Sequence, residues 1–396
     1  MLSRQIAQKL RGYETPFYLY DTALLRQTLE SVVYESKKYG YKVHYAIKAN
    51  YDDHLLAVIR EYGLGIDCAS GNELRKAIEA GFDPKGIVYA GVGKRDKELK
   101  YAIEQNILAI NCESIQELEL VDALSAEAGK VTDIALRINP DIDPKTNHCI
   151  DTGQADSKFG ISYEEVLEHA AEIRSLKNVN IIGLHLHIGS QIRELHVFEN
   201  MCNKVNVIVE NLEKLGCKFR FVDVGGGLGI NYDMPENEPI PNFASLFSIV
   251  HNHLRIGEGI LVSKDLQVDW GIHDMDYLRM DCMTLRAQIV EVKDKPTHPV
   301  GPIVVDCFCN RPTYEDRGIR RRAIAGIGRA DVGDVMMLRP RTPGMTVVGG
   351  SSDHCILDVE DCHPCPRVGD VVDFDVIYLT MLYASAREDV AVKFVD

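Results

Sequence analysis

A lysine that ends an alternating stretch is the residue of this sequence whose position most favours covalent chemistry. Val43 and Tyr45 alternate with His44 as in a β-strand, and the run ends on Lys48. We expect a lysine at the C-terminal end of a buried barrel strand to point into the mouth of a pocket. Burial there lowers its pKa and lets the amine attack a carbonyl. The best-attested use of such a lysine is a Schiff base with pyridoxal phosphate, and a solvated surface charge is the alternative.

Two histidines further along the chain form a second candidate. The segment from His185 to Gln191 reads HLHIGSQ, so His185 and His187 lie on the same face of a strand end. Such a pair can bind a metal, but the sequence shows no third ligand.

A glycine-rich run forms a third candidate. The segment from Asp223 to Gly229 reads DVGGGLG. Its consecutive glycines, Gly225, Gly226 and Gly227, let backbone N–H groups close around an anion without a side chain in the way. The loop after the seventh strand of a barrel is a common phosphate site, and a flexible turn is the alternative.

The pattern around these residues predicts an α/β fold with a parallel barrel as its scaffold. We expect strands around residues 43–47, 64–68, 86–90, 107–111, 133–138, 181–187, 219–224 and 254–257. Helices fill the gaps, for example over residues 71–80, 113–128, 163–175 and 197–215. Eight strands separated by such helices indicate a (β/α)8 barrel. An open doubly wound sheet is the runner-up, but no Gly-x-Gly-x-x-Gly follows a first strand.

The texture of the sequence changes after residue 262. Short β-branched segments separated by Pro and Gly turns follow, at residues 284–293, 300–305, 345–348, 354–359 and 371–376. This pattern predicts a C-terminal all-β domain.

The composition excludes several classes of partner. A formal net charge of −15 over 396 residues argues against nucleic acid and anionic membranes. There is no N-terminal apolar segment and no run of about 18 apolar residues, so we expect a soluble, cytoplasmic protein. The 11 cysteines are an odd number and scattered, which fits reduced thiols. Neither Cys307-x-Cys309 nor Cys362-x-x-Cys365 has a second pair at zinc spacing, so we interpret both as loop cysteines and predict no metal.

Several motifs resemble those of a known family. The segment YAIKAN, from Tyr45 to Asn50, resembles the cofactor-lysine motif of the pyridoxal-phosphate decarboxylases of the alanine-racemase fold, which act on diaminopimelate, ornithine and arginine. Further similar pieces follow in the family's order: DCASGNEL at 67–74, RINP at 137–140, KFGI at 158–161, HLHIGSQ at 185–191 and DVGGGLG at 223–229. Over residues 15–250 the diaminopimelate decarboxylases are the most similar subgroup.

The resemblance implies a set of roles for residues around pyridoxal 5′-phosphate. In this reading Lys48 holds the cofactor, His187 stacks on its ring, and Arg137 and Asp353 contact the amino-acid substrate. The groups near the cofactor phosphate would be Ser190, Gly225, Gly226, Gly227 and Tyr378. The family also implies a barrel over residues 24–262 and a β domain made of residues 1–23 and 263–396, with the strand near Tyr18 joining the second domain. A head-to-tail homodimer with shared sites is expected by the same analogy.

Two positions depart from the decarboxylase pattern. The family's eighth strand carries a glutamate at the pyridine nitrogen, whereas this chain has Arg255, as in alanine and ornithine racemases. The proton-donating cysteine of the decarboxylases is replaced by Gly349, and Cys355 would sit in the following strand. Much of residues 251–396 resembles the racemases, including the basic run from Arg317 to Arg322, which is either an anion site or a solvated charge cluster. An arginine cannot take the proton that a carboxylate would share with the ring, so Arg255 predicts slower decarboxylation.

These patterns leave three hypotheses in order. The first is decarboxylation of meso-diaminopimelate to lysine and CO2. The second is racemisation of an amino acid, with Lys48 serving one face of Cα. The third is a protein that binds the cofactor without efficient turnover.

Overall fold

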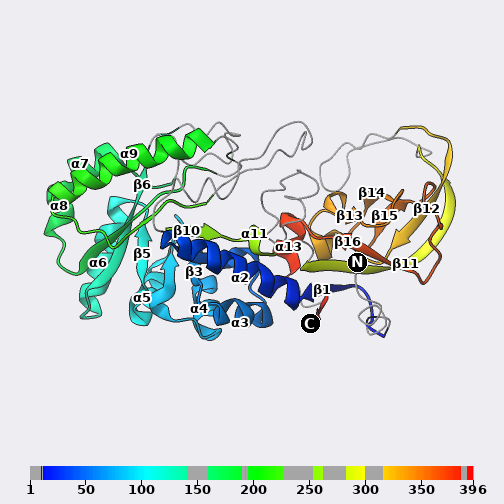
Figure 1. The fold of residues 1–396 in the computed structure, drawn as a ribbon, viewed down its shortest axis with the longest axis horizontal. Coiled ribbons are helices and arrows are strands. Elements are labelled where there is room, and N and C mark those ends of the chain that lie inside the picture. The colour runs from blue at the N-terminus through cyan, green and yellow to red at the C-terminus, as the bar shows by residue number, and fades with distance from the viewer. Residues whose placement is uncertain are drawn as a thin grey trace. The chain divides into compact units, whose positions relative to one another are not determined.

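The computed structural model describes residue 10 and residues 12–140, 142, 159–189, 192, 195–226, 253–261, 282–298, 315–384 and 390–395. The chain divides into two compact units, one spanning Leu24–Met280 and the other combining Met1–Ala23 with Asp281–Asp396 (Figure 1). The predicted boundary at residue 262 falls among residues 262–281, which lie outside the described part. No helix of the described part is long and apolar enough to cross a membrane.

The first unit contains the predicted parallel barrel. Its described strands are β2 (Lys42–Ala46), β3 (Gly65–Cys68), β4 (Ile87–Tyr89), β5 (Ala109–Cys112), β6 (Thr132–Asn139), β8 (Val179–His185), β9 (Phe221–Asp223) and β10 (His253–Ile256). They pair side by side in this order, and β10 returns to β2, so the ring closes. A short strand that the sequence did not predict, β7 (Ile161–Ser162), adds to the edge of β6. The expectation of a (β/α)8 barrel is therefore confirmed.

Helices follow the barrel strands as the sequence pattern requires. They are α2 (Thr22–Tyr39), α3 (Asp53–Glu61), α4 (Gly71–Glu79), α5 (Asp96–Gln105), α6 (Ile115–Glu127), α7 (Tyr163–Glu168), α8 (Ala170–Ser175), α9 (Leu195–Lys214) and α11 (Glu258–Leu261). Three begin on a serine or aspartate whose side chain accepts a backbone N–H, at Asp52, Ser70 and Ser114. The helix predicted over residues 163–175 is instead two helices, which meet at His169.

The second unit is an all-β sheet with two short helices. Strand order is β13 (Arg339–Pro340), β16 (Val371–Asp375), β11 (Met283–Pro296), β12 (Ile319–Ala325), β15 (Cys355–Asp358) and β14 (Thr346–Gly350). The helices are α12 (Arg329–Val332) and α13 (Tyr378–Ala384). Of the predicted segments, residues 300–305 lie outside the described part.

The N-terminal strand joins this second unit, as the family resemblance implied. β1 (Phe17–Asp21) pairs antiparallel with β11 and parallel with β17 (Ala391–Val395). Tyr18 is buried, and its hydroxyl donates to the backbone oxygens of Thr380 at 3.3 Å and Asp331 at 3.4 Å. One strand from the start of the chain therefore contacts both short helices of the unit.

The basic run Arg317 to Arg322 lies mostly in strand β12, which the sequence did not identify. Arg320 Nε lies 2.7 Å from Asp358 Oδ2, and Arg321 Nε lies 2.8 Å from Asp294 Oδ1. These arginines form ion pairs with carboxylates of the neighbouring strands, so the run contributes to pairing within its own sheet.

Candidate active site

The sequence-predicted groups of the barrel unit come from the C-terminal ends of its strands. In a closed parallel barrel these ends open on one face, where loops carry the functional side chains. The described groups are Lys48 after β2, Asp67 in β3, Glu113 after β5, Arg137 in β6, His185 and His187 at β8, Gly225 and Gly226 after β9, and Arg255 in β10.

Lys48 lies in a tight turn after its strand, and the burial predicted for it is wrong. Strand β2 ends at Ala46, and the 3-10 turn Ile47–Ala49 follows, with Ile47 and Ala49 buried and Lys48 exposed. The alternation predicted through residue 48 stops earlier because the chain turns at the strand end. The turn is fixed from below, since the Tyr45 hydroxyl donates to the Asn50 backbone oxygen at 2.9 Å. Lys48 is thus a mobile amine on a rigid base.

Arg255 is held between two buried carboxylates. Its Nη1 atom lies 3.1 Å from Asp67 Oδ2, and its Nε atom lies 3.4 Å from Asp223 Oδ1. Burial alone would lower the pKa of Arg255, but Asp223 and Asp67 raise it, so the guanidinium stays charged. Burial raises the pKa of Asp67 and of Asp223, and Arg255 opposes both shifts. Sequence reasoning had picked out Arg255 but missed both partners.

His187 packs directly against the glycine-rich turn. Gly225 has φ +79°, and a Cβ atom there would lie 2.6 Å from Leu186 O, 2.8 Å from His187 Nδ1 and 3.1 Å from Arg255 Nη2. Gly226 N lies 3.5 Å from His187 Nδ1. Burial, followed by the charges of Arg255, Arg137 and Lys48, holds the pKa of His187 well below its usual value. The imidazole is therefore neutral at physiological pH.

Arg137 is the centre of a second buried ion pair. Arg137 Nη1 lies 2.8 Å from Glu113 Oε1, and both side chains are almost fully buried. The Phe159 ring lies 4.6 Å from the Arg137 guanidinium carbon, which brings part of the KFGI motif to this site. Lys158 lies outside the described residues.

Glu113 is itself tied to neighbouring loops, and sequence reasoning missed it. Its Oε1 accepts the Gly91 N–H at 2.7 Å. Its own N–H donates to Glu117 at 2.7 Å, and Glu117 pairs with the fully buried amine of Lys94 at 2.8 Å. The only signal in the sequence is a glutamate directly after a buried barrel strand.

His185 faces the barrel interior and does not share the setting of His187. It is fully buried, and its Nδ1 accepts from Asn111 Nδ2 at 3.1 Å. Burial, followed by the charges of Arg255 and Arg137, holds the pKa of His185 well below its usual value.

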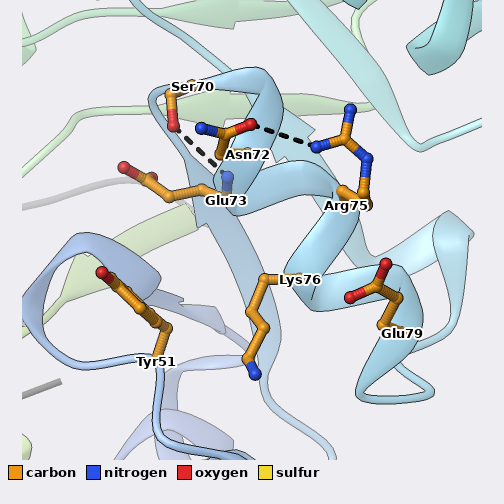
Figure 2. A pocket seen from close by; sticks show the side chains of 7 residues that line it. All are labelled: Tyr51, Ser70, Asn72, Glu73, Arg75, Lys76 and Glu79. Atoms are coloured by element: carbon orange, nitrogen blue, oxygen red, sulfur yellow. Dashed lines mark hydrogen bonds between the residues drawn. The ribbon is translucent and has the colours of Figure 1, made fainter. Parts of the chain in front are cut away.

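A pocket of about 400 Å³ lies at the rim beside the Lys48 turn (Figure 2). Tyr51 and Lys76 face its centre, and Ser70 and Glu73 line it at the start of α4. Ser70 accepts the Glu73 N–H at 3.3 Å, which confirms Ser70 as the cap of α4. Burial raises the pKa of Glu73, while Lys48 is close enough to oppose this shift.

Other predicted groups are not brought to this cluster by the described structure. Ser190 and Gly227 lie outside the described residues. Tyr378 and Asp353 belong to the second unit, where Tyr378 starts α13 and Asp353 is exposed beside Ser351 and His354.

Cys355 cannot replace the cysteine that the decarboxylases carry near Gly349. It starts β15 and is fully buried, and its register partner across the strands is Gly350. Burial raises the pKa of Cys355 to about 12, so its thiol is a poor acid as well as an inaccessible one. The expectation from the sequence is confirmed on this point.

The described groups fit a planar, anionic cofactor. The backbone at Gly225 leaves no room for a side chain next to the His187 ring. Three buried polar atoms, Asp67 Oδ1, His185 Nε2 and Asp223 Oδ2, have no hydrogen-bond partner among the described residues. Unpaired buried polar atoms are rare in native proteins, and they mark places where a polar ligand binds. The cluster is also rich in cations, which favours a phosphate-bearing ligand.

Comparisons with known proteins agree with this geometry. Residues 26–256 match the family described as pyridoxal-dependent decarboxylase, pyridoxal binding domain. The diaminopimelate decarboxylase of Bacteroides thetaiotaomicron is 45% identical over 249 residues, which cover 63% of this chain and 64% of that protein. The diaminopimelate decarboxylase of Aquifex aeolicus is 40% identical over 229 residues, covering 58% of this chain and 54% of that protein. The matched segment thus spans less than two thirds of these relatives.

Solved structures extend the similarity to the whole chain. The diaminopimelate decarboxylase from Helicobacter pylori complexed with L-lysine has a TM-score of 0.76 at 25% identity, covering 99% of this chain and 94% of that one. The lysine decarboxylase from Selenomonas ruminantium shares the fold, with a TM-score of 0.70 at 18% identity over 100% of this chain and 96% of that one. The family match covers more than half of the chain and includes every described residue of the cluster. The chain belongs to the pyridoxal-dependent decarboxylase family, whose cofactor is pyridoxal phosphate.

Proposed function

We propose that this protein is a decarboxylase of a diamino acid, converting meso-diaminopimelate to lysine and CO2. The observation that carries the proposal is the 45% identity to a diaminopimelate decarboxylase over the barrel segment. That segment positions Lys48, His187, Gly225 and Arg137 at one end of a closed barrel.

Lys48 would hold the cofactor covalently through its amine. Its exposed position on an anchored turn gives the amine freedom to leave the cofactor when substrate arrives and to carry a proton to and from Cα. Neutral His187 would cover one face of the ring without adding charge. Gly225 and Gly226, with Gly227, Ser190 and Tyr378, would surround the phosphate.

Bound pyridoxal phosphate would supply the electron sink for the bond broken at Cα. Arg255 tunes this chemistry, because a guanidinium locked to Asp67 and Asp223 cannot take a proton from the ring nitrogen. Arg137, neutralised by Glu113, would help to orient the substrate carboxylate, and Asp353 would contact the substrate from the second unit.

Racemisation is the second candidate, and Arg255 is the observation that favours it. A ring kept unprotonated is a weaker electron sink, and the resemblance to racemases over residues 251–396 goes with that feature. We further propose a cytoplasmic homodimer in which each second unit completes a partner's site.

One incubation in deuterated water tests these readings. The protein with pyridoxal phosphate is given diaminopimelate, ornithine, lysine or alanine separately, and CO2 release and deuterium at Cα are followed. CO2 with lysine from diaminopimelate supports decarboxylation. Deuterium at Cα with loss of chirality and no CO2 overturns decarboxylation in favour of racemisation.

The Lys48→Ala variant provides the control for both reactions. It should lose turnover and the absorbance band of covalently attached cofactor together. If the parent protein binds the cofactor but neither releases CO2 nor exchanges deuterium with any substrate, the third hypothesis of binding without turnover holds instead.

A further inference from the structure

We propose that Cys362 and Cys365 of the second unit form a reversible disulfide by exchange with anionic low-molecular-weight disulfides. Both lie in the loop that follows β15, and neither takes part in the cofactor chemistry proposed above. The inference therefore stands independently of the proposed decarboxylase activity.

The loop sets one buried thiol behind one accessible thiol. The Cys362 N–H donates to Val359 O at 3.2 Å, which closes a turn at the end of β15. Cys362 is 1% exposed, whereas Cys365, three residues later, is half-buried. Burial raises the pKa of Cys362, and Cys365 is close enough to add to this shift. A thiol pair of this kind has an attacking member and a resolving member.

Cys365 borders a pocket of about 560 Å³ that we call the thiol pocket, lined also by Lys293, Asp294, Arg321 and Arg367. Arg321 hydrogen-bonds the Cys365 sulfur in addition to its bond with Asp294. A thiolate, not a thiol, attacks a disulfide, and an adjacent guanidinium stabilises the thiolate. Three cations against one carboxylate also attract an anionic reagent to this position.

A metal site is the competing use of a Cys-x-x-Cys pair, and the described residues do not supply one. Among them, no group of three or more His, Cys, Asp or Glu side chains is placed to hold a metal ion. Two thiols in one loop, without further ligands, are suited to disulfide exchange instead.

The exchange balances in two steps. The Cys365 thiolate attacks one sulfur of the small disulfide, forms a mixed disulfide and releases one small thiol. The Cys362 thiolate then attacks Cys365, closes the intramolecular disulfide and releases the second small thiol. The small disulfide is reduced, the protein is oxidised, and two protons pass from the protein thiols to the departing thiolates.

The test exposes the reduced full-length protein to glutathione disulfide, then blocks free thiols with N-ethylmaleimide and maps peptides by mass spectrometry. The parent protein should carry an internal Cys362–Cys365 disulfide. Cys362→Ser should retain glutathione on Cys365, because the resolving thiol is absent. Cys365→Ser should react much more slowly at Cys362. Glutathione on both cysteines of the parent, or none on Cys365 of Cys362→Ser, would overturn the proposal.

Two matched comparisons check the assignment. Cys355→Ala, in the buried strand before the loop, should leave disulfide formation unchanged. Arg321→Gln should slow the reaction of Cys365 severalfold and Arg321→Lys should restore most of it. Cystamine, a cationic disulfide, should react more slowly than glutathione disulfide, and the opposite order would overturn the role of the thiol pocket.

Discussion

Arg255 Nη1 lies 3.1 Å from Asp67 Oδ2, between strands that are 188 residues apart in the sequence. Because Asp223 is also within reach, one guanidinium compensates two buried carboxylates. Replacing Arg255 by Met should therefore lower the free energy of unfolding by about 3–5 kcal/mol, since both carboxylates lose their counter-charge. Urea denaturation of the barrel unit measures this, and Arg255→Lys should recover part of the loss. An Arg255→Met protein as stable as the parent would contradict the pairing.

The same pairing decides how a decarboxylase-like glutamate can be restored. Arg255→Glu alone places a third carboxylate beside Asp67 and Asp223, so we expect poor folding. Combined with Asp67→Asn and Gly349→Cys, it should raise CO2 release from diaminopimelate above that of Asp67→Asn alone. Equal rates in the two proteins would show that the ring nitrogen and the missing cysteine do not limit decarboxylation.

Gly225 should tolerate no side chain. Gly225→Ala adds a Cβ that meets Leu186 O at 2.6 Å, so cofactor affinity should fall by at least about tenfold, equivalent to about 1.4 kcal/mol. Gly40 is the matched control, since it has φ +70° and nothing within 4 Å of an added Cβ. Gly40→Ala should cost about 1 kcal/mol of stability from backbone strain and leave cofactor affinity unchanged. Titration with pyridoxal phosphate and urea denaturation separate the two effects.

The buried pair of Glu113 and Arg137 should matter more than exposed pairs. Glu113→Ala leaves a buried guanidinium uncompensated and should destabilise the protein by about 3 kcal/mol. It should also raise KM for the amino acid, because Arg137 loses its orientation. Lys100 and Glu127 form an exposed pair at 3.0 Å, and Lys100→Ala should change neither quantity measurably.

His185 should make the barrel sensitive to acid. Its pKa is held well below the usual value in the folded protein, so below about pH 6.5 only the unfolded chain takes up this proton. Stability from this residue is thus present at higher pH and falls as the pH drops, by up to about 1.4 kcal/mol per pH unit.

His185→Asn, which keeps an acceptor for Asn111, should reduce that dependence. The measurement compares urea midpoints of the two proteins at about pH 7.5 and about pH 5.5. Asp67 and Asp223 have raised pKa values and act in the opposite sense, but they are common to both proteins and cancel in the difference. An identical pH dependence in the two proteins would rule out this role for His185.

Periodicity and turn residues predicted most of the fold, because each barrel strand is a short buried run between helices with local start signals. The helix split at His169 and the strand β12 were missed. In β12 the arginines of alternate positions hide the strand signal, and only their carboxylate partners across the sheet explain them.

The candidate site was predictable where a motif carries the chemistry by itself, as at Lys48 and Gly225. It was not predictable where the environment comes from distant strands, as for the carboxylates around Arg255 and for Glu113. Burial of Lys48 was predicted wrongly because a continuous strand was assumed where the chain turns. Such contacts depend on the register of the closed barrel, which no local pattern encodes.

The pairing of β1 with both β11 and β17 has a consequence for synthesis of the chain. The barrel residues leave the ribosome before any strand that can pair with β1, so Phe17–Asp21 must wait as an unpaired edge until residues 391–395 are made. Nascent chains stalled before residue 391 will expose this apolar strand, and they are the form of the protein that most needs a chaperone.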